Sequence, residues 1–167
     1  IRSKASTHYK RPTFNERYWN NSGNVDLKSE NGWNYELGVV MLSQKALYGD
    51  ITLDFNAYKA RNDDLIAWQP GSGTLWKPIN IGKTVIQGVD IEATHFLKVK
   101  NNSLRTSLKY AYNDAYNNDK ESDNYKKTLA YRPHHIVKFS SDYLFGKWEF
   151  GILGTVRSNT NTWEGDQ

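Results

Sequence analysis

Two adjacent histidines, His134 and His135, are the side chains in this sequence that first suggest metal chemistry. Imidazole nitrogens are common ligands of transition metals. The segment that begins here alternates like a strand, however, and neighbouring residues of a strand point to opposite faces. We therefore expect one histidine to face inward and the other to lie at an interface, so that the pair does not share a metal ion.

Carboxylate groups gather at two places in the chain. One loop contains four of them: Asp114, Asp119, Glu121 and Asp123. Oxygen ligands of this kind suit calcium, but their spacing matches no calcium-binding loop, and a solvated acidic loop is the expectation. Asp63 and Asp64 are neighbours whose side chains diverge, so they do not form a carboxylate pair. These patterns therefore predict no metal site among the carboxylates.

Aromatic side chains in the loops are better candidates for binding a ligand. Aromatic residues make up 14% of the chain, which excludes a disordered segment. Their rings supply a large and rigid contact area. The predicted ligand contacts are Tyr18, Trp19, Trp68, Trp76, Tyr116 and Tyr125. The alternative for each is a structural place, either in an aromatic girdle at a membrane interface or in packing of loop against loop.

The loops that carry these aromatic residues alternate with segments of period-two hydrophobicity, which predict strands. These segments are residues 1–10, 31–43, 51–58, 84–97, 103–113, 135–145 and 147–157. Short turns between them alternate with three long loops, at residues 11–30, 62–83 and 114–133. Ile86 is out of phase with Val89, and a bulge near Gln87 and Gly88 would restore the register. No helix is needed anywhere.

Charged residues recur on the face of these strands opposite to the apolar residues. They are Lys4, Glu36, Asp54, Glu92, Arg105, Lys109, Asp142 and Glu149. A transmembrane barrel has this pattern, with apolar residues toward lipid and polar residues toward a wet interior. A soluble sheet with one wet face also has it. In a soluble sandwich, a second sheet would cover the face that contains Leu104, Leu108 and Tyr110.

Composition narrows the classes further. The net charge of +4 is spread along the chain and mixed with acidic residues, so a nucleic-acid interface is not predicted. The absence of cysteine excludes disulfides and thiolate metal sites. The mean hydropathy is -0.77, and no apolar run is long enough for a membrane helix. The chain opens without the apolar segment of a secretory signal, as expected if it is cut from a longer protein.

Two stretches resemble a known family, the TonB-dependent outer-membrane receptors. The first is RPTFNE at residues 11–16, followed by YW at 18–19 and GNVDLKSE at 23–30. The second is NDDLIAW at residues 62–68, followed by WKPINIGK at 76–83 and QGVDIEA at 87–93. The first stretch departs from the family pattern at Arg17, Val25 and Ser29, and the second has Asp90 in place of glutamate. The resemblance extends over essentially the whole chain.

The resemblance implies an all-β fold, namely an antiparallel up-and-down transmembrane β-barrel of which residues 1–167 form a fragment of about seven strands. Family members have about 22 strands and an N-terminal plug domain, so the plug and the remaining strands are expected outside this chain. The long loops, with the C-terminal tail, would be extracellular and the short turns periplasmic.

The function that the resemblance implies is uptake of a large, scarce nutrient across the outer membrane of a Gram-negative bacterium. Uptake needs no covalent chemistry, so the resemblance implies no catalytic residue, no metal ion and no cofactor. The implied ligand is cobalamin or a ferric siderophore. Energy would come from the TonB system through the plug, and a surface lipoprotein is a further implied partner alongside outer-membrane lipid. The alternative from another class is a soluble β-sandwich that binds carbohydrate or acts as an adhesin. A glycosidase is a third possibility, although nothing selects a carboxylate pair.

Overall fold

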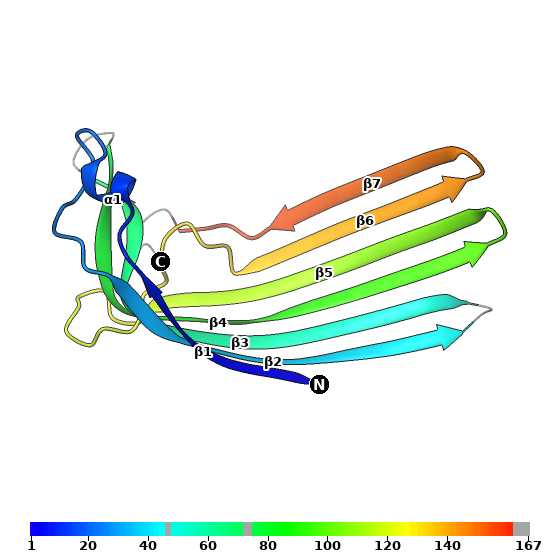
Figure 1. Ribbon diagram of the computed structural model, residues 1–167, viewed down its shortest axis with the longest axis horizontal. Helices are drawn as coiled ribbons and strands as arrows, with labels where there is room; N and C mark the ends of the chain where they lie inside the picture. The colour runs from blue at the N-terminus through cyan, green and yellow to red at the C-terminus, as the bar shows by residue number, and fades with distance from the viewer. Residues whose placement is uncertain (46–47, 72–74, 162–167) are drawn as a thin grey trace.

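A computed structural model describes residues 1–45, 48–71 and 75–161, and in these ranges the fold is one antiparallel sheet (Figure 1). Seven strands follow one another in the sheet in the order of the sequence. The strands are β1 (Arg2–Lys10), β2 (Glu30–Lys45), β3 (Gly49–Pro70), β4 (Trp76–Val99), β5 (Asn102–Asn117), β6 (His135–Phe145) and β7 (Trp148–Arg157). The predicted all-β class and up-and-down order are confirmed.

The long loops after β1 and β5 lie at one end of the sheet and the short turns after β2, β4 and β6 at the other, as predicted for these connections. The connections after β1, β3 and β5 gather at one end, on the left of Figure 1, and those after β2, β4 and β6 lie at the other. We call these the long-loop end and the short-turn end. Asn161 belongs to the long-loop end, because its carbonyl accepts a hydrogen bond of 2.9 Å from the backbone N–H of Tyr131.

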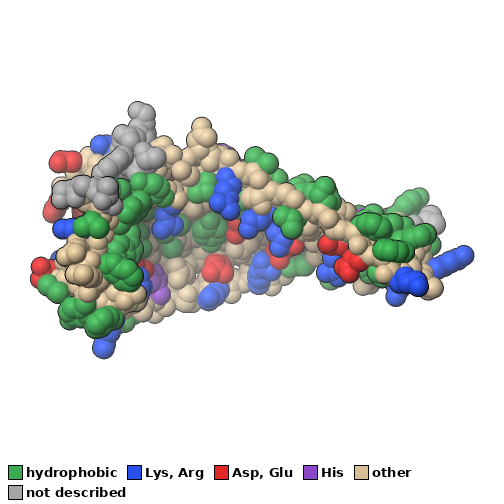
Figure 2. Space-filling view, turned by 90° about the horizontal axis from the view of Figure 1, so that it is seen from above, with side chains coloured by type: hydrophobic (Ala, Val, Ile, Leu, Met, Phe, Trp, Pro, Cys, Tyr) green, Lys and Arg blue, Asp and Glu red, His purple; other side chains and the backbone are tan. Residues whose placement is uncertain are grey.

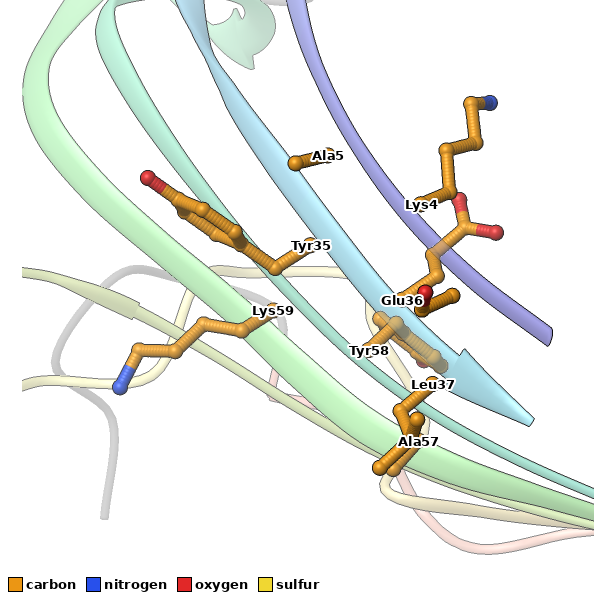
Figure 3. A pocket seen from close by; sticks show the side chains of 9 residues that line it. Lys4, Ala5, Tyr35, Glu36, Leu37, Ala57, Tyr58 and Lys59 are labelled. Carbon is orange, nitrogen blue, oxygen red and sulfur yellow. The ribbon is translucent and has the colours of Figure 1, made fainter. Parts of the chain in front are cut away.

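The charged side chains predicted for the inner face do share one face, which we call the polar face. Cross-strand pairing places Lys4 opposite Glu36, and Glu92 opposite Lys109. The Lys109 Nζ atom lies 2.9 Å from a Glu92 carboxylate oxygen. Acidic and basic side chains gather in the hollowed middle of the molecule in Figure 2. A close view shows Lys4 and Glu36 on one side of the strands, with Tyr35 and Lys59 directed to the other (Figure 3).

The opposite face, which we call the apolar face, has no protein layer over it in the described part of the chain. Leu108 at its centre is 49% exposed, and Phe150 on β7 is 59% exposed. A soluble sandwich would bury these side chains under a second sheet, and the described residues contain one sheet. Within those residues, no helix has the length and apolarity to cross a membrane.

The second predicted loop, over residues 62–83, is wrong, because β3 and β4 continue through most of it. Residues 72–74 at the tip lie outside the described ranges, so only part of the predicted turn is seen, where the N–H of Gly71 donates to the carbonyl of Leu75 at 2.8 Å. The pairing passes over Asp64 and Gly82, between the pairs Asp63–Lys83 and Leu65–Ile81. Asp64 has a φ of 54°, so the backbone is irregular at this point.

The alternation of side chains changes phase at Asp64 and Gly82. Ile81 and Ile86 are five positions apart, which would put them on opposite faces of a regular strand, yet they pack in the same cluster. This finding replaces the predicted bulge near Gln87 and Gly88, where pairing with β3 is continuous. Ile86 is out of phase with Val89 because it faces the polar side and packs in a small core at the long-loop end.

That small core holds in place the part of the β3–β4 hairpin that extends beyond Asp64 and Gly82, which we call the extended hairpin. Its buried members are Leu65, Ile81, Ala115 and Leu129, with Ala67, Ile79 and Ile86 packed against them. Leu129 comes from the loop after β5, and its N–H donates to the carbonyl of Ala115 at 2.8 Å. The hydrophobic effect therefore fixes the loops at this end, whereas the described residues form no second cluster of buried apolar side chains elsewhere in the sheet.

Candidate ligand-binding site at the long-loop end

The loop after β1 contains a short helix, α1 (Phe14–Tyr18), which the sequence analysis did not predict. A capping box forms it: the Glu16 N–H donates to the Thr13 hydroxyl at 3.2 Å, and the Glu16 carboxylate accepts from the Thr13 N–H at 2.7 Å. The same carboxylate lies 2.9 Å from Lys10 Nζ. Thr13 and Glu16, three positions apart, therefore have a structural role, because their side chains satisfy backbone N–H donors at the start of the helix.

Glu16 is an unusual carboxylate because it is only 7% exposed yet carries its charge inside the loop. Burial raises its pKa, but the hydrogen bonds from Thr13 and the ion pair with Lys10 together outweigh that cost, and the net pKa is lowered. The side chain is therefore ionised at neutral pH and holds the start of α1 against the end of β1.

The chain turns back after α1 in a tight crossing. The N–H groups of Gly23 and Asn24 donate to the carbonyls of Trp19 and Glu16, at 2.8 and 2.9 Å. A Cβ atom on Gly23 would lie 2.4 Å from the carbonyl oxygen of Arg17, so only glycine allows this approach. The Arg17 guanidinium then donates to the carbonyl of Leu27 at 3.2 Å. The loop after β1 is therefore an ordered unit.

This ordered loop docks on β4 through an asparagine. The N–H of Lys28 donates to Asn80 Oδ1 at 2.9 Å, and Asn80 Nδ2 donates to the carbonyl of Lys28 at 3.1 Å. Asn80 Nδ2 also donates to the carbonyl of Asp64 at 2.8 Å, which joins β3 to the same junction. Asn24 adds a hydrogen bond of 3.1 Å to the carbonyl of Pro78. The two stretches that carry the family resemblance therefore bind each other.

The loop after β5 approaches the same hairpin. The N–H of Asn118 donates to the carbonyl of Lys83 at 2.7 Å. The rings of Trp76 and Tyr131 pack with their centroids 5.0 Å apart. The extension of β3 and β4 beyond Asp64 is thus held by both neighbouring loops.

A hollow of about 480 Å³ lies in this assembly. Its aromatic and charged lining comes from Trp68, Trp76, Tyr131 and Arg132, over a base that includes Leu65 and Leu129. We call it the aromatic hollow. Aromatic faces pack against flat or apolar groups, and a guanidinium supplies hydrogen-bond donors for carbonyl, carboxylate or phosphate oxygens. Such a lining suits reversible binding.

The six predicted contact residues fall in three places. Tyr18 and Trp19 lie at the end of α1 and are 56% and 57% exposed. Trp68 and Trp76 share the aromatic hollow. Tyr116 and Tyr125 both lie against Lys126, whose Nζ is 4.3 and 5.4 Å from their ring centroids.

Sequence reasoning missed Tyr131 and Arg132 as hollow residues. Tyr131 is a loop aromatic residue that satisfied the criterion used for the other candidates. Its position beside Trp76 depends on how the loop after β5 folds, which no local pattern indicates.

A ring nitrogen of each of the two histidines lies within hydrogen-bonding distance of a partner in the protein. His135 Nδ1 and the Tyr110 hydroxyl are 2.9 Å apart, and His134 Nδ1 is 3.1 Å from the carbonyl oxygen of Asn113. Their rings pack near Tyr112. Within residues 1–45, 48–71 and 75–161, no group of three or more His, Cys, Asp or Glu side chains is placed to hold a metal ion.

Comparison with known proteins identifies the family. Residues 1–167 match the family described as TonB dependent receptor-like, beta-barrel. The chain belongs to this family. The resemblance predicted from the two stretches of sequence is thereby confirmed, and the open sheet of seven strands is a fragment of a TonB-dependent receptor barrel.

Two relatives of the TonB-dependent family are named as vitamin B12 transporters. The chain is 31% identical over 164 residues to Vitamin B12 transporter BtuB of Photobacterium profundum, covering 96% of this chain and 25% of that protein. It is 37% identical over 92 residues to Vitamin B12 transporter BtuB of Vibrio vulnificus, covering 54% and 14%. The chain therefore spans about a quarter or less of the curated relatives it matches.

A solved structure shares the fold. The sheet superimposes on Copper transporter OprC with a TM-score of 0.64 and 21% sequence identity, covering 90% of this chain and 22% of the other. At this identity the likeness concerns the fold. It agrees with a sheet that has one charged face and one uncovered apolar face, as the wall of an outer-membrane β-barrel requires.

Proposed function

We propose that the protein to which this chain belongs is an outer-membrane receptor that takes up cobalamin. The observation that supports this most directly is the identity of 31% with a vitamin B12 transporter over 96% of the chain. Residues 1–167 then form part of one barrel domain, with the plug and the remaining strands supplied by the rest of the protein. Strands β1 and β7 each require a neighbour, since an unpaired strand edge is unstable in lipid.

In this proposal the long-loop end faces the outside of the cell and the short-turn end faces the periplasm. The TonB system supplies energy through the plug, and a surface lipoprotein is a further partner that delivers ligand. The protein moves its ligand without breaking bonds, so it is not an enzyme.

The aromatic hollow is the proposed contact for the ligand. Cobalamin combines a flat ring system with amide carbonyls and a phosphodiester, and the hollow offers flat aromatic faces beside the Arg132 guanidinium. Tyr18 and Trp19 are proposed as further contacts, because they are exposed on the neighbouring loop. Tyr116 and Tyr125 lie with Lys126 and do not line the hollow.

The test uses the intact receptor purified in detergent, with cyanocobalamin as the ligand and ferrichrome as the competing siderophore. Isothermal titration should give tight binding of cyanocobalamin and none of ferrichrome. Binding of ferrichrome alone would overturn the proposed ligand. Trp76→Ala and Tyr131→Ala should each weaken cyanocobalamin binding by about 10-fold or more, as expected for central aromatic contacts.

The matched control is Trp148→Ala. Trp148 is also an exposed tryptophan, at 65%, but it begins β7 at the short-turn end. The control should bind cyanocobalamin like the unmodified receptor. If Trp76→Ala and Trp148→Ala both bind normally, the ligand contacts lie outside the aromatic hollow.

A further inference from the structure

Four basic side chains surround a second hollow, of about 470 Å³, near the long-loop end. They are Lys59, Arg61, Lys83 and Lys126, and we call them the basic rim cluster. Trp33 and Tyr116 line the same hollow. The ligand-binding proposal above does not use these residues.

The basic rim cluster lies on the apolar face. Pairing places Trp33 opposite Arg61, and Arg61 opposite Val85, which in turn faces Tyr116. One rung nearer the short-turn end, Tyr35 is opposite Lys59. Figure 3 shows Tyr35 and Lys59 directed to the side of the sheet opposite to Lys4 and Glu36. These cations therefore point away from the polar face.

Positive charge in the cluster is largely uncompensated. Among the described residues, Lys59, Arg61 and Lys83 make no ion pair, whereas Arg2 and Lys109 on the polar face both do. Lys126 donates to Asn118 Oδ1 at 3.1 Å and lies over two tyrosine rings.

Two carboxylates lie near these cations. Asp63 also lines the hollow, and Asp114 nearby accepts a hydrogen bond of 3.2 Å from Gln87. Four cations beside these two carboxylates leave a net positive charge, so the hollow is suited to an anion.

The position of the basic rim cluster along the strands indicates where such an anion would lie relative to a membrane. On the apolar face of β4, Val89, Ile91, Ala93, Leu97 and Val99 form the apolar band, which His95 interrupts with its ring 2.8 Å from the carbonyl oxygen of Tyr48. The stretch from Val89 to Val99 matches the 9 to 11 residues that a strand needs to cross a bilayer. The basic rim cluster begins directly beyond this band, where Trp33 and Tyr35 stack with their centroids 6.4 Å apart. Aromatic residues mark the boundary between hydrocarbon and headgroups. The cations therefore lie at headgroup level.

We propose that the basic rim cluster binds the phosphate of a lipid headgroup in the membrane leaflet at the long-loop end. The lipid placement rests on the proposed function, because it requires the apolar face to meet a bilayer. Arg61 supplies a planar pair of donors that suits phosphate oxygens, and the lysines supply point charges. Lysine side chains at such a boundary can keep their methylene groups against apolar surface while the ammonium group lies in the polar layer.

The test measures lipid retention by native mass spectrometry of the intact receptor in detergent. Dioleoyl phosphatidic acid, dioleoyl phosphatidylcholine and inorganic phosphate are the probes. The receptor should retain phosphatidic acid at about 10-fold lower concentration than phosphatidylcholine, and added salt should reduce this preference. The double variant Arg61→Gln, Lys83→Gln should bind phosphatidic acid about 30-fold more weakly, since each cation near a membrane surface contributes about fivefold.

The matched control is the double variant Lys4→Gln, Lys138→Gln, which removes two cations from the polar face and should retain phosphatidic acid normally. Equal retention of the two lipids, or displacement of phosphatidic acid by inorganic phosphate at the same concentration, would overturn the proposal. Salt dependence in the unmodified receptor decides the question if the double variant fails to fold. Cyanocobalamin binding is measured in parallel: its absence with lipid preference intact would refute the proposed ligand and leave this inference standing.

Discussion

Asn80 and Lys28 lie 52 positions apart in the chain and exchange two hydrogen bonds, of 2.9 and 3.1 Å. One amide side chain thus acts as a strand partner for a loop, because it offers an acceptor and a donor to the same residue. The junction also reaches Asp64, at the point where the alternation of β3 changes phase. The loop after β1 and the extended hairpin are therefore one unit.

Replacing Asn80 should release the loop after β1 from β4. Asn80→Ala leaves the N–H and carbonyl of Lys28 without their partners, at a cost of about 1–3 kcal/mol to local order. Hydrogen exchange in the intact receptor should show faster exchange at residues 24–29 and unchanged exchange in β5. Asn20→Ala is the control, as Asn20 is exposed on the same loop. Unaltered exchange at residues 24–29 in Asn80→Ala would show that other contacts hold the loop.

The order of α1 should depend on pH through Glu16. The pKa of this carboxyl is lowered from its ordinary value of 4.5, so the stability it contributes is present above that value and is lost as the pH falls through the lower, folded pKa. Hydrogen exchange at residues 13–24 should therefore speed up in acid relative to Glu16→Gln, in which position 16 has no charge to lose.

Glu121→Gln is the control for this experiment, because Glu121 is an exposed carboxylate on another loop. It should follow the unmodified receptor. A constant difference between the receptor and Glu16→Gln across the acid range would mean that ionisation of Glu16 does not stabilise the loop.

Gly88 should not tolerate a side chain. A Cβ atom there would lie 2.1 Å from the carbonyl oxygen of Tyr112 and 2.6 Å from the Tyr58 hydroxyl oxygen. Gly88→Ala should therefore lower stability by about 1–3 kcal/mol. Gly154→Ala is the matched control, because a Cβ atom on Gly154 meets nothing within 4 Å. The measurement is denaturant unfolding of the intact receptor in lipid vesicles. An equal loss of stability in both variants would contradict the close approach of Tyr58 and Tyr112 to Gly88.

Substitutions that reverse the polarity of two adjacent residues on β5 should differ in how much stability they cost. Leu108→Lys places a charge on the apolar face and should cost about 2–4 kcal/mol in a bilayer. Lys109→Leu removes an exposed ion pair with Glu92 on the polar face and should cost about 0–1 kcal/mol. Unfolding in lipid vesicles provides both values. If Lys109→Leu were the more harmful change, the assignment of the two faces would be reversed.

Sequence patterns predicted best the parts of the chain where a strand separates two environments. The alternation from Leu104 to Tyr112 is strict because one side is apolar and the other is charged, so a period of two is readable. The same logic failed at residues 62–83. There the loops after β1 and β5 pack against the hairpin, and the alternation changes phase at Asp64 and Gly82. These strand residues therefore show no regular period of two and resemble a loop in sequence.

The short helix and the aromatic hollow were not predicted from the sequence, each for a different reason. Five residues are too few for a helical period, although Thr13 and Glu16 do form a readable capping signal. The hollow unites Trp68 with Tyr131 through loop packing, and no local spacing records that contact. Each of the six aromatic candidates has a loop position of its own, and nothing in their spacing indicates which of them are neighbours.

The change of phase at Asp64 and Gly82 divides the hairpin of β3 and β4 into two segments whose side chains meet different surroundings. On the short-turn side of this joint, the proposed function places outward-pointing residues of β3 and β4 against lipid or, at the basic rim cluster, against its headgroups, and places inward-pointing residues against water. On the other side, Leu65 and Ile81 point inward and are buried. Substitutions that reshape the loop end therefore leave the anchoring half of the same strands untouched. Under the proposed function, one pair of strands therefore carries the ligand-contacting surface and the membrane anchor as separate segments.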